Sequence, residues 1–89
     1  MNYDTIKRLI DNNDYDKAIE ELDLLIETNP NDDEAHYLKG RIYQRKLQWD
    51  NAIASYSKAI ELNADSKAVV ALEMLYDILS SMNNKIIET

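Results

Sequence analysis

The sequence nearly repeats itself after 34 residues. Five residues, Ala18, Ile19, Ile26, Glu27 and Asn29, recur as Ala52, Ile53, Ile60, Glu61 and Asn63, while Tyr15 is matched by Trp49 and Asp16 by Asp50. A period of this length is typical of an array in which each unit buries its apolar face against the next. The sequence therefore predicts stacked units and a shared surface suited to holding a partner.

The residues between these matches favour helices. The 89 residues include one Gly and one Pro, and Leu, Ile, Ala, Glu and Lys recur at helical spacings. We predict an all-α fold of five helices at about 2–12, 15–29, 33–47, 50–62 and 67–82. The chain is then a single domain, 1–89, with repeat 1 at about 1–32, repeat 2 at about 33–66, a closing helix at about 67–82 and a short tail at 83–89.

Short polar side chains mark the expected helix ends. Asp14 is placed to cap the second helix, and Asn31 with Glu34 three residues later resembles a capping box for the third. The turn at Gln48, Trp49 and Asp50 leads into the fourth helix. The pair Asn83–Asn84 predicts the end of the fifth.

Charge and composition exclude several classes of function. Ten Lys and Arg against 17 Asp and Glu give a net charge of −7, which repels phosphate backbones and anionic lipid heads, so we expect no nucleic-acid or membrane partner. The absence of Cys excludes disulfides and thiol chemistry. No run approaches the roughly 20 apolar residues of a bilayer span, and the first residues lack the features of a leader. We expect a soluble, cytoplasmic protein.

In the second unit, 33–66, small and aromatic residues alternate, as Gly40, Tyr43, Ala52, Tyr56 and Ala59. This pattern resembles the helix-packing positions of a tetratricopeptide repeat. Small residues there admit a neighbouring helix and aromatic residues fill the remaining gap. The unit departs from the pattern at His36, Lys39 and Ala64. The first unit matches more weakly, through Ala18, Leu22, Leu25 and Pro30.

This resemblance implies two antiparallel helix–turn–helix repeats plus a capping helix, stacked as a right-handed α-solenoid. The first helix of each repeat would line a concave groove, and its candidate peptide contacts are Tyr3, Lys7, Tyr37, Arg41, Gln44 and Arg45. The three cations could bind carboxylates of a peptide. Alternatively, Asp11 neutralises Arg45 and Arg41 is only solvated. Tyr3 and Lys7 replace the Lys and Asn with which some family members clamp a C-terminal carboxylate, which disfavours chaperone-tail binding.

The fifth helix carries an apolar stripe wider than the about 100° that buries one face of a surface helix. We expect the surplus, centred on Ala71, Leu75 and Ile78, to bind protein, most simply as a two-fold homodimer. The self-association candidates are Ala71, Leu72, Leu75, Ile78, Leu79 and Met82. In one alternative these side chains fold back over the third helix. In another, the chain is a small adaptor whose C-terminal helix docks on a different protein.

Nothing in the sequence indicates an enzyme. His36, the single histidine, stands at a helix-packing position, and the acidic run from Asp11 to Asp16 lacks the ligand spacing and central Gly of a calcium loop. Phosphate loops, nucleophile motifs and metal-ligand spacings are absent. We predict no catalytic residue, metal or cofactor, and a non-catalytic interaction module that binds a protein or peptide.

Overall fold

Five helices make up the part of the chain that the structure describes. The computed structural model describes the backbone of residues 3–87 and the side chains of residues 3–82. The helices are α1 (Tyr3–Asp11), α2 (Tyr15–Thr28), α3 (Asp33–Arg45), α4 (Trp49–Leu62) and α5 (Ala68–Ile87). The predicted all-α fold of five helices is confirmed.

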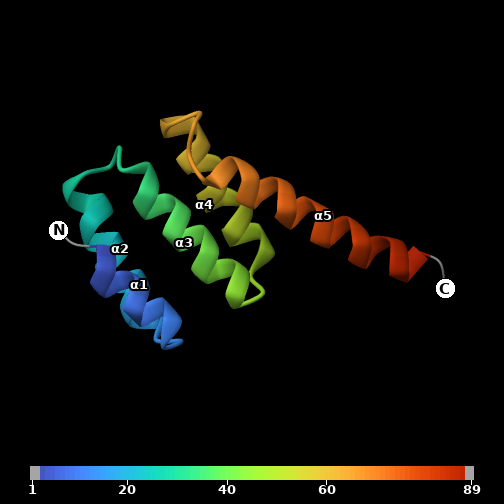
Figure 1. Ribbon diagram of the computed structural model, residues 1–89, viewed down its shortest axis with the longest axis horizontal. Coiled ribbons are helices and arrows are strands. Elements are labelled where there is room, and N and C mark those ends of the chain that lie inside the picture. The colour runs from blue at the N-terminus through green and yellow to red at the C-terminus, as the bar shows by residue number, and fades with distance from the viewer. Residues whose placement is uncertain (1–2, 88–89) are drawn as a thin grey trace.

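Consecutive helices pair as two antiparallel hairpins, α1 with α2 and α3 with α4 (Figure 1). Helix α5 begins against α4, and its C-terminal part extends beyond the other helices (Figure 1). The molecule is accordingly elongated, with extents of 48 × 29 × 17 Å.

The turns inside the two hairpins share one backbone conformation. Asn13 and Leu47, which are 34 residues apart, both have positive φ values, 63° and 61°. Asn tolerates this left-handed conformation through its short polar side chain, whereas Leu pays a steric cost. The left-handed residue also explains why α3 ends at Arg45 rather than at the predicted Leu47.

Helices α3 and α5 begin on equivalent caps. The Asp32 carboxylate accepts a hydrogen bond from the Ala35 N–H at 3.3 Å, and the buried Ser66 hydroxyl accepts one from the Ala68 N–H at 3.1 Å. These capping residues are also 34 apart, so α5 begins as the first helix of a third repeat would.

Two predicted caps are wrong in detail. The cap of α3 is Asp32 rather than Asn31, so the chain forms no capping box with Glu34 there. Asp14 does occupy the N-cap position of α2, but its side chain makes no capping hydrogen bond.

Two predicted helix boundaries are also wrong. Helix α5 continues through Asn83–Asn84 to Ile87, because Asn lowers helix propensity by only about 0.7 kcal/mol and no Gly or Pro follows it. Trp49 is the first residue of α4 rather than part of the turn. Residues 1–2 and 88–89, at the ends of the predicted first repeat and tail, lie outside the described residues.

The core consists of two clusters, one formed by α1, α2 and α3 and the other by α4 and α5. Ile6, Ile10, Ala18, Leu22, Leu25, Ala35, Leu38 and Ile42 form the first cluster, and Ala52, Tyr56, Ala59, Ala68 and Leu75 form the second. Gly40 lets α3 approach α4 closely, because a Cβ atom there would lie 2.4 Å from two ring carbons of Tyr56. The small residue of the predicted packing pattern is therefore required by the Tyr56 ring.

Candidate functional site: the concave face

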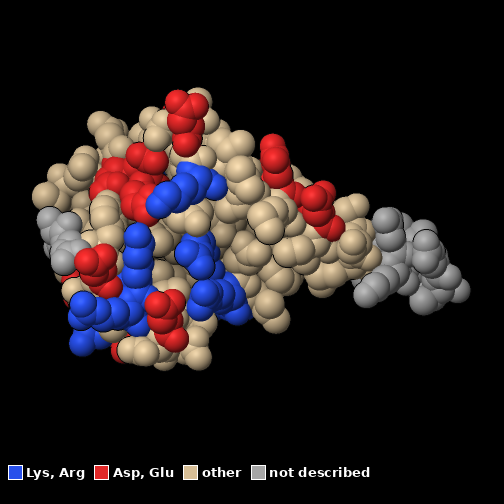
Figure 2. Space-filling view, in the orientation of Figure 1, with Lys and Arg blue, Asp and Glu red and all other residues tan. Residues whose placement is uncertain are grey.

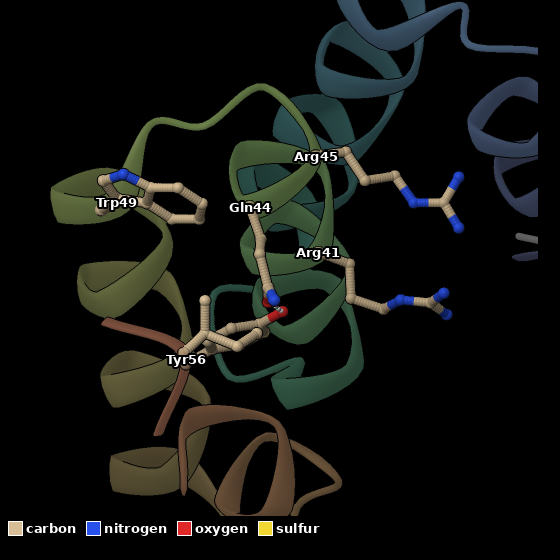
Figure 3. A pocket seen from close by; sticks show the side chains of 6 residues that line it. Arg41, Gln44, Arg45, Trp49 and Tyr56 are labelled. Atoms are coloured by element: carbon tan, nitrogen blue, oxygen red, sulfur yellow. Dashed lines mark hydrogen bonds between the residues drawn. The ribbon is translucent and has the colours of Figure 1, made fainter. Parts of the chain in front are cut away.

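A hollow of about 310 Å³ opens where α3, α4 and α5 meet. It is lined by Arg41, Gln44 and Arg45 from α3, by Trp49 and Tyr56 from α4, and by Ile78 from α5. Figure 3 shows Gln44 directed at Tyr56, with Trp49 on one side and the two arginines on the other. We call the surface around this hollow the groove.

The floor of the groove is uncharged and fixed. The Tyr56 hydroxyl donates a hydrogen bond to Oε1 of Gln44 at 2.8 Å (Figure 3). Burial, reinforced by Tyr37, raises the pKa of Tyr56 to about 12, so the phenol stays protonated at neutral pH. The same ring packs on Gly40, which couples the floor to the α3–α4 contact.

Arg41 and Arg45 supply positive charge at the edge of this floor. Both side chains point the same way, away from Trp49 (Figure 3), and the Arg41 guanidinium lies 6.0 Å from the centre of the Tyr37 ring. Among the described residues, neither arginine has a carboxylate within 4.0 Å; the four ion pairs found there are Lys39–Asp23, Lys46–Asp16, Lys58–Glu61 and Lys67–Glu34. The alternative in which Asp11 neutralises Arg45 is therefore not observed.

A second, smaller hollow of about 170 Å³ lies between α1 and α3. Lys7, Ile10, Asp11, Leu38 and Arg41 line it. Arg41 belongs to both hollows, so the cations of α1 and α3 form one basic strip, Lys7, Arg41 and Arg45. Basic side chains gather on this part of the surface in Figure 2.

A third hollow of about 330 Å³ lies between α3 and α5. Tyr37 and Lys67 line it together with Val70, Ala71 and Met74 of α5. Lys67 is engaged here, because its Nζ lies 3.5 Å from Glu34 and 5.9 Å from the centre of the Tyr37 ring. Because Val70, Ala71 and Met74 form its α5 wall, this hollow is more apolar than the first.

Helix α5 does not present the predicted face. Leu75, placed at the centre of the self-association surface, is fully buried, because α5 turns it with Ala68 onto Ala52, Tyr56 and Ala59. The prediction for Leu75 is wrong, and the half-buried Ala71, Leu72 and Leu79 pack against the same cluster. Another side of the helix, next to this buried face, carries the exposed apolar residues Val70, Met74, Ile78 and Met82.

We call these four residues the α5 row. They are spaced by four, so they follow one side of the helix. The self-association residues predicted from the sequence include neither Val70 nor Met74 of this row, and the predicted groove residues do not include Trp49. The regular spacing from 70 to 82 could have identified the row, whereas nothing in the sequence placed Trp49 beside the arginines.

Two other residues singled out by sequence have structural roles. Tyr3, a predicted groove contact, lines none of the three hollows; its hydroxyl donates to the Asp32 carboxylate, and burial together with that carboxylate raises its pKa. His36 is half-buried with its Nε2 atom unpaired among the described residues, and burial lowers its pKa.

Within the described residues, no helix is both long and apolar enough to cross a bilayer. No three His, Asp or Glu side chains of that part of the chain gather closely enough to hold a metal ion.

Comparison with known proteins identifies the family. Residues 33–66 and residues 9–32 each match a model described as a tetratricopeptide repeat. The solution NMR structure of Bacteroides fragilis protein BF1650 superposes with a TM-score of 0.84 at 40% sequence identity, over 93% of this chain and 89% of that one. None of the curated proteins matches the chain. Tetratricopeptide repeats generally mediate protein–protein interaction and are typically non-catalytic. The chain belongs to the tetratricopeptide repeat family.

Proposed function

We propose that this protein is an interaction module whose groove binds an acidic segment of a partner protein. The observation that supports this most is the pair Arg41 and Arg45, which lie side by side at a hollow with no carboxylate within 4.0 Å among the described residues. Lys7 extends the positive strip onto α1 through the second hollow.

The negative charge on the rest of the molecule would direct an acidic segment to the basic strip. Guanidinium groups bind carboxylates through paired, charge-assisted hydrogen bonds. The chain carries a net charge of −7, so an acidic segment is repelled by most of the surface and attracted at the basic strip. Asp11 is the acidic residue that lines the second hollow, and it would disfavour a carboxylate at the Lys7 end.

Charge reversal tests this proposal. A flexible, fluorescently labelled peptide of alternating Glu and Ser is titrated with the wild type and with Arg45→Glu, whose side chain is exposed. Loss of a hydrogen bond to a charged group costs about 1.5–3 kcal/mol, so we expect affinity to fall about tenfold or more, and to fall also with added salt.

The matched control is Lys17→Glu, the same reversal at an exposed position on α2. We expect it to leave the affinity within about twofold. Equal losses for both variants would indicate non-specific attraction, and binding that ignores Arg45→Glu would contradict the proposed site.

Self-association through α5 is a second candidate function, favoured by the exposed α5 row. Light scattering on a sizing column over a wide concentration range measures it. A dimer that Met74→Asp dissociates and that Leu24→Asp, at an exposed apolar position on α2, leaves intact would support it. A monomer at every concentration would contradict it. Cytoplasmic location stays a prediction.

A further inference from the structure

Helix α4 covers one side of α3, and the corresponding side of α5 is exposed. A shift of 34 residues relates His36 and Gly40 on α3 to Val70 and Met74 on α5. Gly40 is buried under Tyr56 of α4, whereas Val70 and Met74 are each 59% exposed. This part of the α5 surface therefore corresponds to the side of α3 that packs on α4, but among the described residues no helix packs on it.

This face borders the groove. Val70 and Met74 line the hollow that they share with Tyr37 of α3, and Ile78 lines the hollow that holds Arg41 and Arg45. The two hollows thus follow one valley between α3 and α5, with a basic wall on α3 and an apolar wall on α5.

An acidic edge lies beyond the apolar wall. Glu73 and Asp77 are exposed, and at 100° per residue they lie on the side of the α5 row that faces away from Leu75 and the core. Figure 2 shows acidic side chains along one edge of α5. Across the valley the surface is therefore basic at Arg41 and Arg45, apolar along the α5 row, and acidic at Glu73 and Asp77.

We propose that this valley holds an amphipathic helix of another protein, with an apolar face on the α5 row, acidic residues toward α3 and basic residues toward Glu73 and Asp77. The inference rests on the proposed groove function and names the chemistry of its partner. The α5 row extends for about 18 Å, or about three helical turns. A helix of that length can present acidic, apolar and basic rows side by side, whereas an extended segment alternates its side chains between two opposite faces.

The charges favour a different protein over a second copy. If two α5 helices paired antiparallel about a two-fold axis through the α5 row, Glu73 and Asp77 of both copies would lie on the same side of the contact. No basic row of α5 would meet them, because the described side chains of that helix include no Lys or Arg. Each copy also brings a net charge of −7.

Designed peptides test the proposal. The first is an 18-residue helix former with Leu on one face, Glu along one flank and Lys along the other. The second has the same composition with Glu and Lys shuffled over both flanks, and the third carries a central Pro that breaks the helix. We expect the first to bind at least tenfold more tightly than either control, and to lose at least tenfold in affinity with Arg45→Glu and also with Met74→Asp. Leu24→Asp is the matched control, and circular dichroism of each variant checks its folding.

The outcomes separate this proposal from the groove function. If the Pro peptide binds as well as the helical one and only Arg45→Glu weakens it, the helical partner is excluded and the acidic-segment proposal stands. If neither these peptides nor the Glu–Ser peptide binds, both fall. A dimer that Met74→Asp dissociates, and that excludes the helical peptide while intact, would assign the α5 row to a second copy and overturn the proposal.

Discussion

Helices α3 and α5 begin just after capping residues that are 34 positions apart in the sequence. Asp32 caps the first and Ser66 the second, each through a side-chain oxygen that accepts a backbone N–H. From there they differ. Helix α3 is covered by α4 along Gly40, whereas α5 exposes Met74 at the equivalent position.

Position within a repeat therefore does not determine whether a side chain is exposed. Arg41 on α3 lies at the groove, but its equivalent by the 34-residue shift, Leu75, is fully buried. Helix α5 has turned its apolar side onto α4, where Ala68 and Leu75 pack on Ala52, Tyr56 and Ala59. The exposed row is what this rotation leaves outside the core.

The largest expected effect is a difference in the free energy of unfolding between substitutions at two adjacent residues, Met74 and Leu75. Leu75→Ala should lower the free energy of unfolding by about 2–5 kcal/mol, because it empties a fully buried site. Met74→Ala should change it by less than about 0.5 kcal/mol. Urea denaturation measures both, and equal losses would mean that α5 is rotated differently. Leu75→Asp should accordingly unfold the protein rather than only dissociate a dimer.

Gly40→Ala should destabilise by about 1–3 kcal/mol, because the new Cβ would lie 2.4 Å from carbons of the Tyr56 ring. Intrinsic helix propensity alone would favour Ala by about 1 kcal/mol, so the sign of the change identifies the cause. Repeat 1 has Ile6 and Leu22 at these two positions, both buried. Adding Tyr56→Leu should therefore make the loss in the double variant smaller than the sum of the single losses, as thermal unfolding would show.

Removing either cap should have a smaller effect. Ser66→Ala and Asp32→Ala should each cost about 1 kcal/mol, and Ser66→Ala should cost more because it leaves a buried N–H of Ala68 without its acceptor. Chemical denaturation of the two variants side by side gives the comparison. No loss at Ser66 would contradict the view that α5 begins as α3 does.

The smallest expected effect is a pH dependence of stability that His36 causes. Burial lowers the pKa of His36, Lys39 and Lys58 lower it further, and the Pro30 carbonyl and Asp32 oppose them. The unfolded chain therefore binds a proton more readily than the folded one, so His36 should reduce stability as pH falls below about 6.5. His36→Val, which installs the residue found at position 70, should flatten that part of the stability profile. An unchanged profile would mean that His36 is not responsible.

The sequence predicted the hairpins well because their packing is local and periodic. The resemblance to the tetratricopeptide pattern placed Gly40 and Tyr56 at helix-packing positions, and Gly40 does pack on the Tyr56 ring. Both hairpin turns were also located, although one of them has Leu47 in a conformation that Leu rarely adopts. The end of α5 was less predictable, because Asn83–Asn84 only weakly opposes a helix.

The groove was predicted in part. Arg41, Gln44 and Arg45 do line one hollow, because α3 sits within a regular repeat. Leu75 was misplaced, and Val70 and Met74 were missed, because their exposure depends on how α5 rotates against α4. That rotation is a tertiary property and has no periodic signal in the sequence. Trp49 was missed because it was predicted in the turn, whereas it is the first residue of α4.

NMR mapping of the bound peptide tests whether an acidic, amphipathic helix occupies the valley between α3 and α5. Backbone amide shifts of the ¹⁵N-labelled protein are followed by NMR while the helical Glu–Lys peptide is added. We predict the largest shifts in α3 between residues 37 and 45 and in α5 between residues 70 and 78, with α2 little changed. Shifts confined to α2, or no shifts at a peptide concentration that saturates binding in the titrations above, would contradict an acidic helical partner in the valley between α3 and α5.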